Sequence, residues 1–167
     1  MNRWPTTQAF TLIELILVMA LVVAMISVAA PSLSSFFRGR ALNDEARRLL
    51  ALTRSAQSRA VSEGMPMLLW IDAEERAYGV EQETPPRNGD PKAMTFILSE
   101  TVSLEPSAAP PWPVRGKSLP AIRFLPDGLI DESSPTNLHL IGADNASLWL
   151  VQTTNHVSYE IRNTLSP

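Results

Sequence analysis

The stretch that decides the architecture of this chain is Phe10-Thr-Leu-Ile-Glu14, continued by Leu15-Ile-Leu-Val-Met-Ala-Leu-Val-Val-Ala-Met-Ile-Ser-Val-Ala-Ala30. It contains 21 residues, and only Glu14 among them can carry a charge. With a rise of about 1.5 Å per residue, a helix of this length is about 30 Å long, which is the thickness of the hydrocarbon core of a bilayer. The sequence therefore predicts a helix that is long enough to span a membrane.

A secretory signal peptide is the competing interpretation of the same stretch. The apolar core of a signal peptide is shorter, does not begin with a carboxylate, and is followed by a cleavage site of small residues. The stretch fits these features poorly, and we therefore retain the membrane-spanning interpretation.

Glu14 is the unusual residue of this stretch, because an acidic group costs about 2.5–3.5 kcal/mol at the centre of a bilayer and less near its interface. If the chain were cut between Ala9 and Phe10, the new amine of Phe10 would lie four residues from Glu14, on the same helix face. A carboxylate in the first turn also faces the positive end of the helix dipole. We interpret Glu14 as a functional residue that pairs with an amino terminus. The alternative is a charge tolerated at the membrane edge.

At these residues the sequence resembles the type IV pilin-like family, which includes the pseudopilins of type II secretion systems. The match consists of a short polar leader, the junction Ala9–Phe10, Glu14, and an apolar stretch that ends at Pro31. The resemblance implies cleavage before Phe10 by prepilin peptidase, N-methylation of Phe10, and attraction of a neighbouring subunit's amino terminus by Glu14. The sequence departs from the family pattern at Ala9, where glycine is usual, which implies slower processing.

The chain is expected to have four parts. These are a leader peptide (1–9), a transmembrane or filament-core helix (10–31), an amphipathic half of the same long helix (32–63) and a periplasmic β-rich globular domain (64–167). We interpret Pro31 as a kink, because proline removes a backbone hydrogen bond while helical residues resume directly after it. In the family a proline here lets the helix bend as subunits pack. A simple helix stop is the alternative.

The second helical half has a clear amphipathic pattern. Apolar residues recur there at spacings of three, four or seven, and Gly64 is a natural stop signal. The sequence thus predicts one helix from Phe10 to Ser62, about 80 Å long, whose second half buries one stripe against a domain. The stripe consists of Leu42, Ala46, Leu49, Ala56 and Ala60, with Leu52 and Thr53 between them.

Beyond Gly64 the composition changes, since 12 of the 14 prolines lie there and apolar residues alternate with polar ones. We predict six to eight short antiparallel strands that form one sheet with a wet face and a dry face, the dry face covered by the helical stripe. The fold class is α+β, the pilin fold. The expected strands lie at 65–72, 77–82, within 94–104, and at 121–125, 137–141, 147–153 and 156–161, with loops at 84–92 and 105–118.

This half also resembles the family, and more narrowly its minor members of the GspH/FimT type. The matching residues are Leu68-Leu-Trp-Ile-Asp72 directly after the long helix and Ile122-Arg-Phe-Leu-Pro-Asp-Gly128 midway through the sheet.

The sequence offers little catalytic chemistry, and we predict neither an enzyme nor a cofactor or metal site. His139 and His156 are interpreted as ordinary strand residues, since no metal-ligand spacing, nucleophile elbow or phosphate loop is present. The absence of cysteine excludes disulfides and thiolate metal sites. A turn with three acidic residues could offer oxygens to Ca²⁺, but a solvated turn is the preferred interpretation. These residues are Asp127, Asp131 and Glu132.

Three functions compete. The first is a minor pseudopilin of a type II secretion system, anchored by one span in the bacterial inner membrane with its C-terminal domain in the periplasm. Its partners would be other pseudopilins or pilins, prepilin peptidase, the inner-membrane assembly platform and membrane lipid. Counting basic residues on either side of the span would place that domain in the cytoplasm, and here we follow the resemblance.

The second function is a minor pilin of a type IV pilus, including the DNA-uptake type. Binding to nucleic acid would require a basic domain, whereas residues from Gly64 onward carry seven Lys and Arg against thirteen Asp and Glu. Nucleic acid is therefore not an expected partner. The third function is a periplasmic binding module or enzyme that an uncleaved signal anchor holds in the membrane by a single span.

Overall fold

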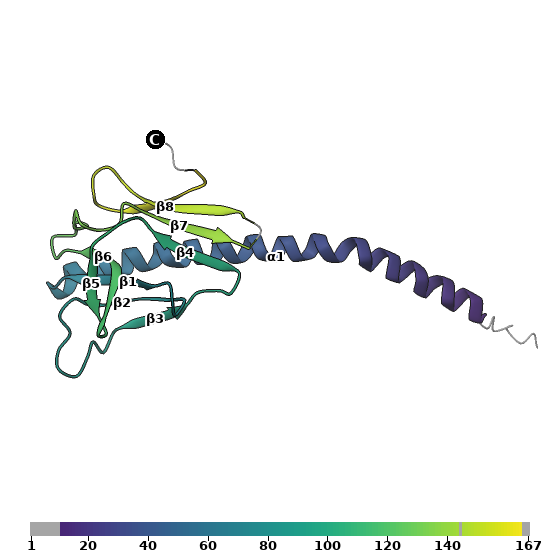
Figure 1. Cartoon of the computed structure of the whole chain (residues 1–167), viewed down its shortest axis with the longest axis horizontal. Coiled ribbons are helices and arrows are strands. Elements are labelled where there is room, and N and C mark those ends of the chain that lie inside the picture. The colour runs from purple at the N-terminus through teal and green to yellow at the C-terminus, as the bar shows by residue number, and fades with distance from the viewer. Residues whose placement is uncertain (1–10, 144, 165–167) are drawn as a thin grey trace, which may run out of the picture. The chain divides into compact units, whose positions relative to one another are not determined.

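The structure is a computed structural model that describes residues 11–143 and 145–164, without the side chains of residues 28–39. The described residues form one α-helix and nine β-strands, in an α+β arrangement (Figure 1). The chain divides into two compact units, one ending at Phe37 and one beginning at Arg38. Each unit is described separately below.

Helix α1 (Leu12–Glu63) confirms the single long helix expected from Phe10 to Ser62. It ends where Gly64 adopts a left-handed backbone with φ of 66°, a conformation that favours glycine after the last helical turn. Pro31 lies inside α1, so the helix does not stop at this proline. The kink at Pro31 remains a prediction.

The second unit contains two antiparallel sheets. The five-stranded sheet has the order β3-β2-β1-β6-β5, and the four-stranded sheet has the order β4-β7-β8-β9. The strands of the first sheet are β1 (Met67–Asp72), β2 (Ala77–Gln82), β3 (Met94–Ile97), β5 (Pro111–Val114) and β6 (Lys117–Phe124). Those of the second are β4 (Val102–Pro106), β7 (Asn137–Gly142), β8 (Ser147–Gln152) and β9 (Tyr159–Arg162).

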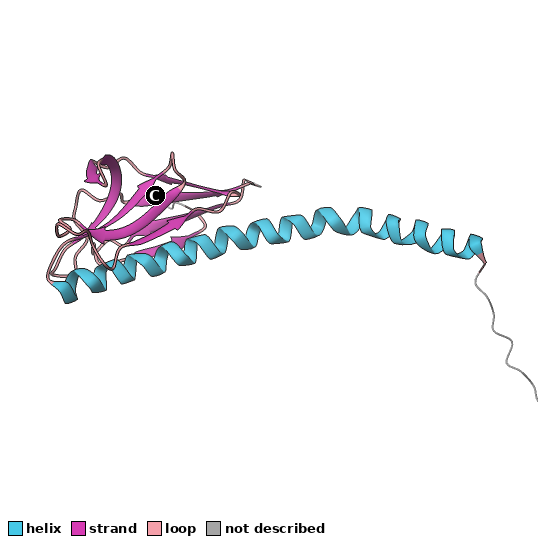
Figure 2. Cartoon of the chain, turned by 90° about the horizontal axis from the view of Figure 1, so that it is seen from below, coloured by secondary structure: helices cyan, strands magenta, loops and turns pink. Residues whose placement is uncertain are grey.

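The second half of α1 runs along one side of the strands of this unit (Figure 2). The predicted stripe from Leu42 to Ala60 is buried, with 1% of Leu49 and 0% of Ala56 exposed. It packs into one core with residues of both sheets, because alternate strand positions point towards the helix. The sheet residues of this core include Met67, Leu69, Ile71, Tyr78, Val80, Ile122, Phe124, Leu138, Leu140 and Leu150.

The prediction of a single sheet with six to eight strands is wrong, because the described residues form nine strands in two sheets. Residues 105–118 were expected to form a proline-rich loop, but β5 lies within them and β6 begins at Lys117 instead of 121. Strand β5 pairs only with β6 and is therefore an edge strand, the position in a sheet where proline is tolerated. Its two prolines, Pro111 and Pro113, are the reason why a loop was predicted here.

The outer face of the five-stranded sheet is also partly buried, contrary to the expectation of one wet face. A second cluster forms there from Leu68, Trp70, Val114 and Ala121. The Trp70 ring lies against Gly79 of β2, where an added Cβ would come within 2.7 Å of the ring. The guanidinium of Arg115 lies over the Trp70 ring, 4.8 Å from its centre.

Candidate assembly interface

The predicted site residue Glu14 lies in the first turn of α1, where its carboxylate faces the positive end of the helix dipole. The backbone N–H of Glu14 donates to the Thr11 hydroxyl at 3.3 Å, which makes Thr11 the N-cap of the helix. A Thr followed three residues later by Glu is the pattern of a capping box. This second role was not predicted, although the spacing of Thr11 and Glu14 is that of a capping box.

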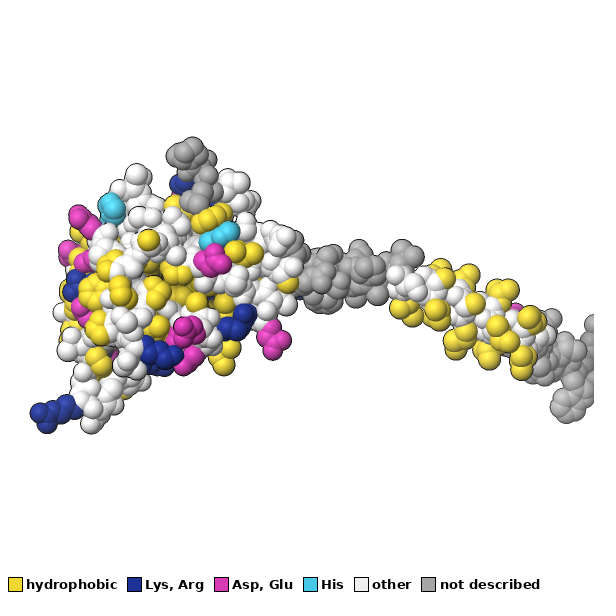
Figure 3. All heavy atoms as spheres, viewed as in Figure 1, with side chains coloured by type: hydrophobic (Ala, Val, Ile, Leu, Met, Phe, Trp, Pro, Cys, Tyr) yellow, Lys and Arg dark blue, Asp and Glu magenta, His cyan; other side chains and the backbone are white. Residues whose placement is uncertain are grey.

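The helix half that follows Glu14 is apolar on every side. All of its described large hydrophobic side chains are more than 40% exposed, from Leu12 at 77% to Val22 at 41%. Figure 3 displays these hydrophobic side chains around the described part of the helix. A helix that is apolar all round is stable only when other apolar groups cover it. This half therefore requires lipid or other helices around it.

The remaining predicted site residues are not tested by the structure. Ala9 and Phe10 lie outside the described residues, and so does the side chain of Pro31. In the part of the chain that the structure describes, no helix is long and apolar enough to qualify as a membrane span. The span predicted for residues 10–31 remains a prediction from the sequence.

The second half of α1 is fastened to the sheets by polar contacts as well as by its apolar stripe. Glu45 is 6% exposed and accepts two hydrogen bonds, from Tyr78 Oη at 2.7 Å and from Arg48 Nη1 at 3.0 Å. Burial and the neighbouring Glu45 carboxylate raise the pKa of Tyr78, so its hydroxyl remains a donor. Gln57 adds a further anchor, because its side-chain amide donates to the backbone oxygens of Gly128 and Val157, at 2.6 Å each.

A network of charged groups holds the C-terminal end of α1 to the loop between β2 and β3. Arg59 donates to both carboxylate oxygens of Asp90, at 3.1 and 3.0 Å, and also to Glu63. Hydrogen bonds from Arg59, Gln82 and Lys92 lower the pKa of Glu63 to about 2. The loop predicted at 84–92 is therefore anchored to α1 through Asp90. The residues at the tip of this loop are exposed.

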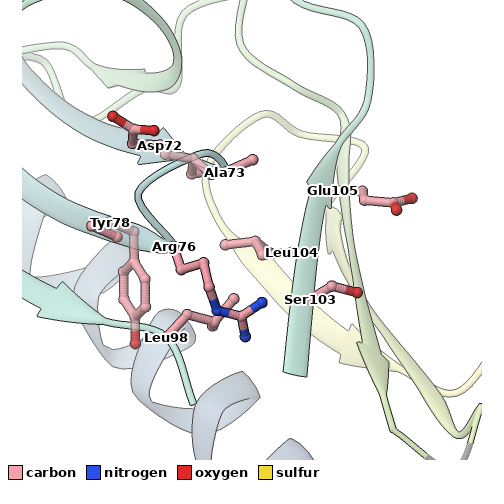
Figure 4. A pocket seen from close by; sticks show the side chains of 10 residues that line it. Asp72, Ala73, Arg76, Tyr78, Leu98, Ser103, Leu104 and Glu105 are labelled. Atoms are coloured by element: carbon pink, nitrogen blue, oxygen red, sulfur yellow. The ribbon is translucent and has the colours of Figure 1, made fainter. Parts of the chain in front are cut away.

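A cavity of about 140 Å³ lies where the β1–β2 turn approaches β4 (Figure 4). Arg76 lines it and donates to the backbone oxygens of Ser99 and Val102, at 2.7 and 2.8 Å. These bonds connect the turn of one sheet to the segment that leads into the other. Arg76 therefore helps to join the two sheets.

The histidines and the acidic turn have ordinary structural surroundings. His139 lies in β7 and stacks on Trp149 with ring centres 3.7 Å apart, while His156 lies in a turn, with φ of 54°. Asp131 binds Arg123 at 2.9 Å, and Asp127 accepts a bond from the Leu129 amide. Among the residues that the structure describes, no three His, Asp or Glu side chains are grouped so as to hold a metal ion.

A family model and solved structures match this chain. A family described as "Type II transport protein GspH" matches residues 45–156. The fold is similar to that of the minor pseudopilin EpsH from the type 2 secretion system of Vibrio cholerae, with a TM-score of 0.50 and 17% identity, over 75% of this chain and 95% of that one. No curated protein matches the sequence.

Proposed function

This chain belongs to the GspH family of type II transport proteins, and we propose that it is a minor pseudopilin, a structural subunit of a short filament in a type II secretion system. The family match carries this proposal, because it covers residues 45–156 and thus most of the folded unit that begins at Arg38. The fold supports it, since it is similar to that of a minor pseudopilin over 75% of this chain.

We further propose that residues 10–31 form a transmembrane helix before assembly and part of the filament core after it. The sequence supports this step through its run of 21 residues with a single charge, Glu14. The exposed apolar side chains of residues 12–26 support it too, because they need either lipid or neighbouring helices as cover. The remainder of the chain, from Arg38 on, would then lie in the periplasm.

Processing gives the proposed subunit its assembly signal. Prepilin peptidase would cut between Ala9 and Phe10 and leave an ammonium group at Phe10, which would then be N-methylated. That cation would be the partner of a Glu14 carboxylate on a neighbouring subunit, because an acid in an apolar environment is stabilised by an opposite charge. Pro31 would let the helix bend as subunits pack, and an inner-membrane platform would drive the assembly.

The experiment that tests the role of Glu14 compares Glu14→Gln with wild type in cells that carry a complete secretion system. We expect the variant to remain in the membrane fraction at the wild-type level but to be reduced at least about fivefold in sheared filaments, because the charge pair is lost. Thr11→Ala is the matched control, since it removes the helix cap but keeps the carboxylate. Equal incorporation of Glu14→Gln and wild type would contradict the proposed role.

A further inference from the structure

The two sheets have four edge strands, β3 and β5 in one and β4 and β9 in the other. A sheet edge presents unpaired backbone N–H and C=O groups, which proteins usually protect with prolines, charged side chains or a covering segment. Strand β5 has Pro111 and Pro113, and β9 has Glu160 and Arg162. Strand β3 has neither kind of protection, because its sequence is Met94-Thr-Phe-Ile97.

The edge of β4 is covered at one end and lacks a donor at the other. Arg76 donates to the Val102 backbone oxygen at 2.8 Å, and the Val102 N–H donates to the Ser99 oxygen at 3.0 Å. Pro106, at the other end of β4, has no N–H. Among the strands that the structure describes, β3 is therefore the edge without such protection, and it lies at the margin of the strands in Figure 1.

The register of β3 determines which of its backbone groups are free. The Leu98 N–H donates to the Arg76 oxygen at 2.7 Å, and β3 continues the same antiparallel register with β2. Because hydrogen-bonded pairs alternate along such a ladder, Phe96 bonds to β2, whereas the N–H and C=O groups of Thr95 and Ile97 point away from it. No residue in the described part of the chain forms a hydrogen bond to these outward groups.

The side chains of Thr95 and Ile97 lie on the outer face of the five-stranded sheet. Ile97 is 78% exposed, the highest value for a large hydrophobic side chain in the described residues. Its cross-strand neighbour is Ala77, whose small side chain gives it little cover. A single exposed isoleucine is ordinary on a protein surface. This one, however, belongs to the strand with the free backbone groups, so both can contact the same partner.

Arg115 places a charged group beside Thr95. Its Nη2 donates to Thr95 Oγ1 at 2.9 Å, and its Nε donates to Glu81 at 3.0 Å. The Arg115 side chain is 48% exposed, and its Nη1 forms no hydrogen bond with the described residues. Because a guanidinium has five N–H donors, Arg115 can still bind a carboxylate that lies next to Thr95.

We propose that β3 accepts an extended segment of a different filament subunit as an added strand. The backbone of this segment bonds to Thr95 and Ile97, and main-chain bonds of this kind supply the affinity of strand addition. On the outer face, an apolar side chain of the segment packs beside Ile97 and a carboxylate two positions away binds Arg115, because residues two apart in a strand share a face. The partner segment is therefore extended, with an apolar and an acidic residue at this spacing.

A second copy of this chain is a less suitable occupant of the edge. Its β3 has no carboxylate, and it would bring a second Arg115 guanidinium to the same face. The inference rests on the proposed function, since a minor subunit has subunits of other types as neighbours. An added strand fills the edge once, so this contact does not repeat along the filament.

The test mixes the full chain, in detergent micelles, with each of the other pseudopilins of the same secretion system, one at a time. Photoreactive benzoylphenylalanine in place of Ile97 reports contact with the edge, and the same group in place of Val157, another exposed apolar residue, is the control. We expect one partner to cross-link at position 97 and not at position 157. The cross-linked segment should contain Asp or Glu two positions from an apolar residue.

Residue-resolved hydrogen exchange distinguishes strand addition from a contact of side chains alone. The amides of Thr95 and Ile97 have no acceptor in the described residues, so they should exchange rapidly in the free chain. On binding of the cross-linked partner, we expect their exchange to slow by at least about tenfold, because an added strand supplies the acceptors.

Two variants block the edge in different ways. Thr95→Pro removes an outward N–H and leaves the bonds to β2 in place, whereas Ile97→Lys keeps the N–H and adds a charge at the edge. Each is expected to weaken binding of the partner by at least about tenfold. Val61→Lys is the matched control, because Val61 is 53% exposed on α1 beside Gly128, and it should bind as wild type does. Ile97→Lys alone decides the question if Thr95→Pro fails to fold.

The proposal is wrong if none of the pseudopilins binds, if a partner binds without slowing exchange at Thr95 and Ile97, or if Ile97→Lys binds as wild type does. Cross-linking at position 97 only to a second copy of this chain would also overturn it. Each of these results refutes the edge contact alone when the wild-type chain is found in sheared filaments. Absence of the wild-type chain from filaments refutes the proposed function instead.

Discussion

At two positions the structure shows a role for a residue that was not predicted from the sequence. Glu14 is an acid in an apolar helix half, and it also follows the N-cap Thr11 at the spacing of a capping box. The requirement for glycine at position 79 was not predicted, yet the Trp70 ring leaves no room for a side chain there. The capping box is a local pattern that the sequence contains, whereas the contact at Gly79 depends on strand pairing, which local patterns do not encode.

At this scale, the pH dependence of stability tests the network at the end of α1. The pKa of Glu63 is lowered to about 2 in the folded chain from an ordinary value of about 4.5. A carboxylate with a depressed folded-state pKa stabilises the fold fully above its unfolded pKa, and that stability is lost as pH falls from about 4.5 towards 2. Glu63→Gln is therefore expected to lower the urea midpoint at pH 7 and to flatten its fall between pH 4.5 and 2.5.

Glu132→Gln is the control for this measurement, because Glu132 is exposed and has no ion pair among the described residues. It should keep the wild-type slope. If Glu63→Gln has the same acid slope as wild type, the low pKa of Glu63 does not contribute to stability in the way described here.

Among the elements, α1 was predicted almost completely and the strands only in part. Helical periodicity from Leu42 to Ala60 and the glycine after the helix are local signals, and the structure confirms both. Strand β5 was missed because Pro111 and Pro113 normally indicate a loop, and only the pairing with β6 makes them an edge strand. The division into two sheets depends on long-range pairing of strands, which local patterns do not encode.

Packing of this helix on the sheets is tested by substituting two alanines five residues apart. Ala56 is 0% exposed in the core, whereas Ala51 lies on the exposed side of the same helix. We expect Ala56→Leu to lower the free energy of unfolding by about 1–3 kcal/mol, because the added atoms overfill a packed core. Ala51→Leu should change it by less than about 0.5 kcal/mol. Urea unfolding measures both, and equal effects would contradict the stated orientation of the helix.

For the whole molecule, the structure separates a unit that begins at Arg38 from the part before it. The first unit is apolar on all sides where it is described, while the second has its own core of helix and sheet residues. The α+β fold and the covered face of the helix were predictable because the sequence contains an amphipathic stripe that can cover the sheets. The family could be inferred from the region around Ala9 to Glu14, although the later match falls on residues 45–156.

This division predicts that the fragment of residues 38–167 folds without the rest of the chain. It retains the buried stripe and both sheets, so we expect it to be soluble and monomeric at micromolar concentration. Circular dichroism should give mixed helix and strand content, and urea unfolding should be cooperative. A spectrum dominated by helix, or aggregation at micromolar concentration, would contradict this prediction.

We propose that this chain is a processed filament subunit whose new amino terminus makes assembly possible. Intact-mass spectrometry of the protein, isolated from cells with an active prepilin peptidase, tests it most directly. We expect a chain that has lost residues 1–9 and begins with a methylated Phe10. Recovery of the chain with Met1 and the leader still attached, in cells whose other prepilins are processed, would contradict it.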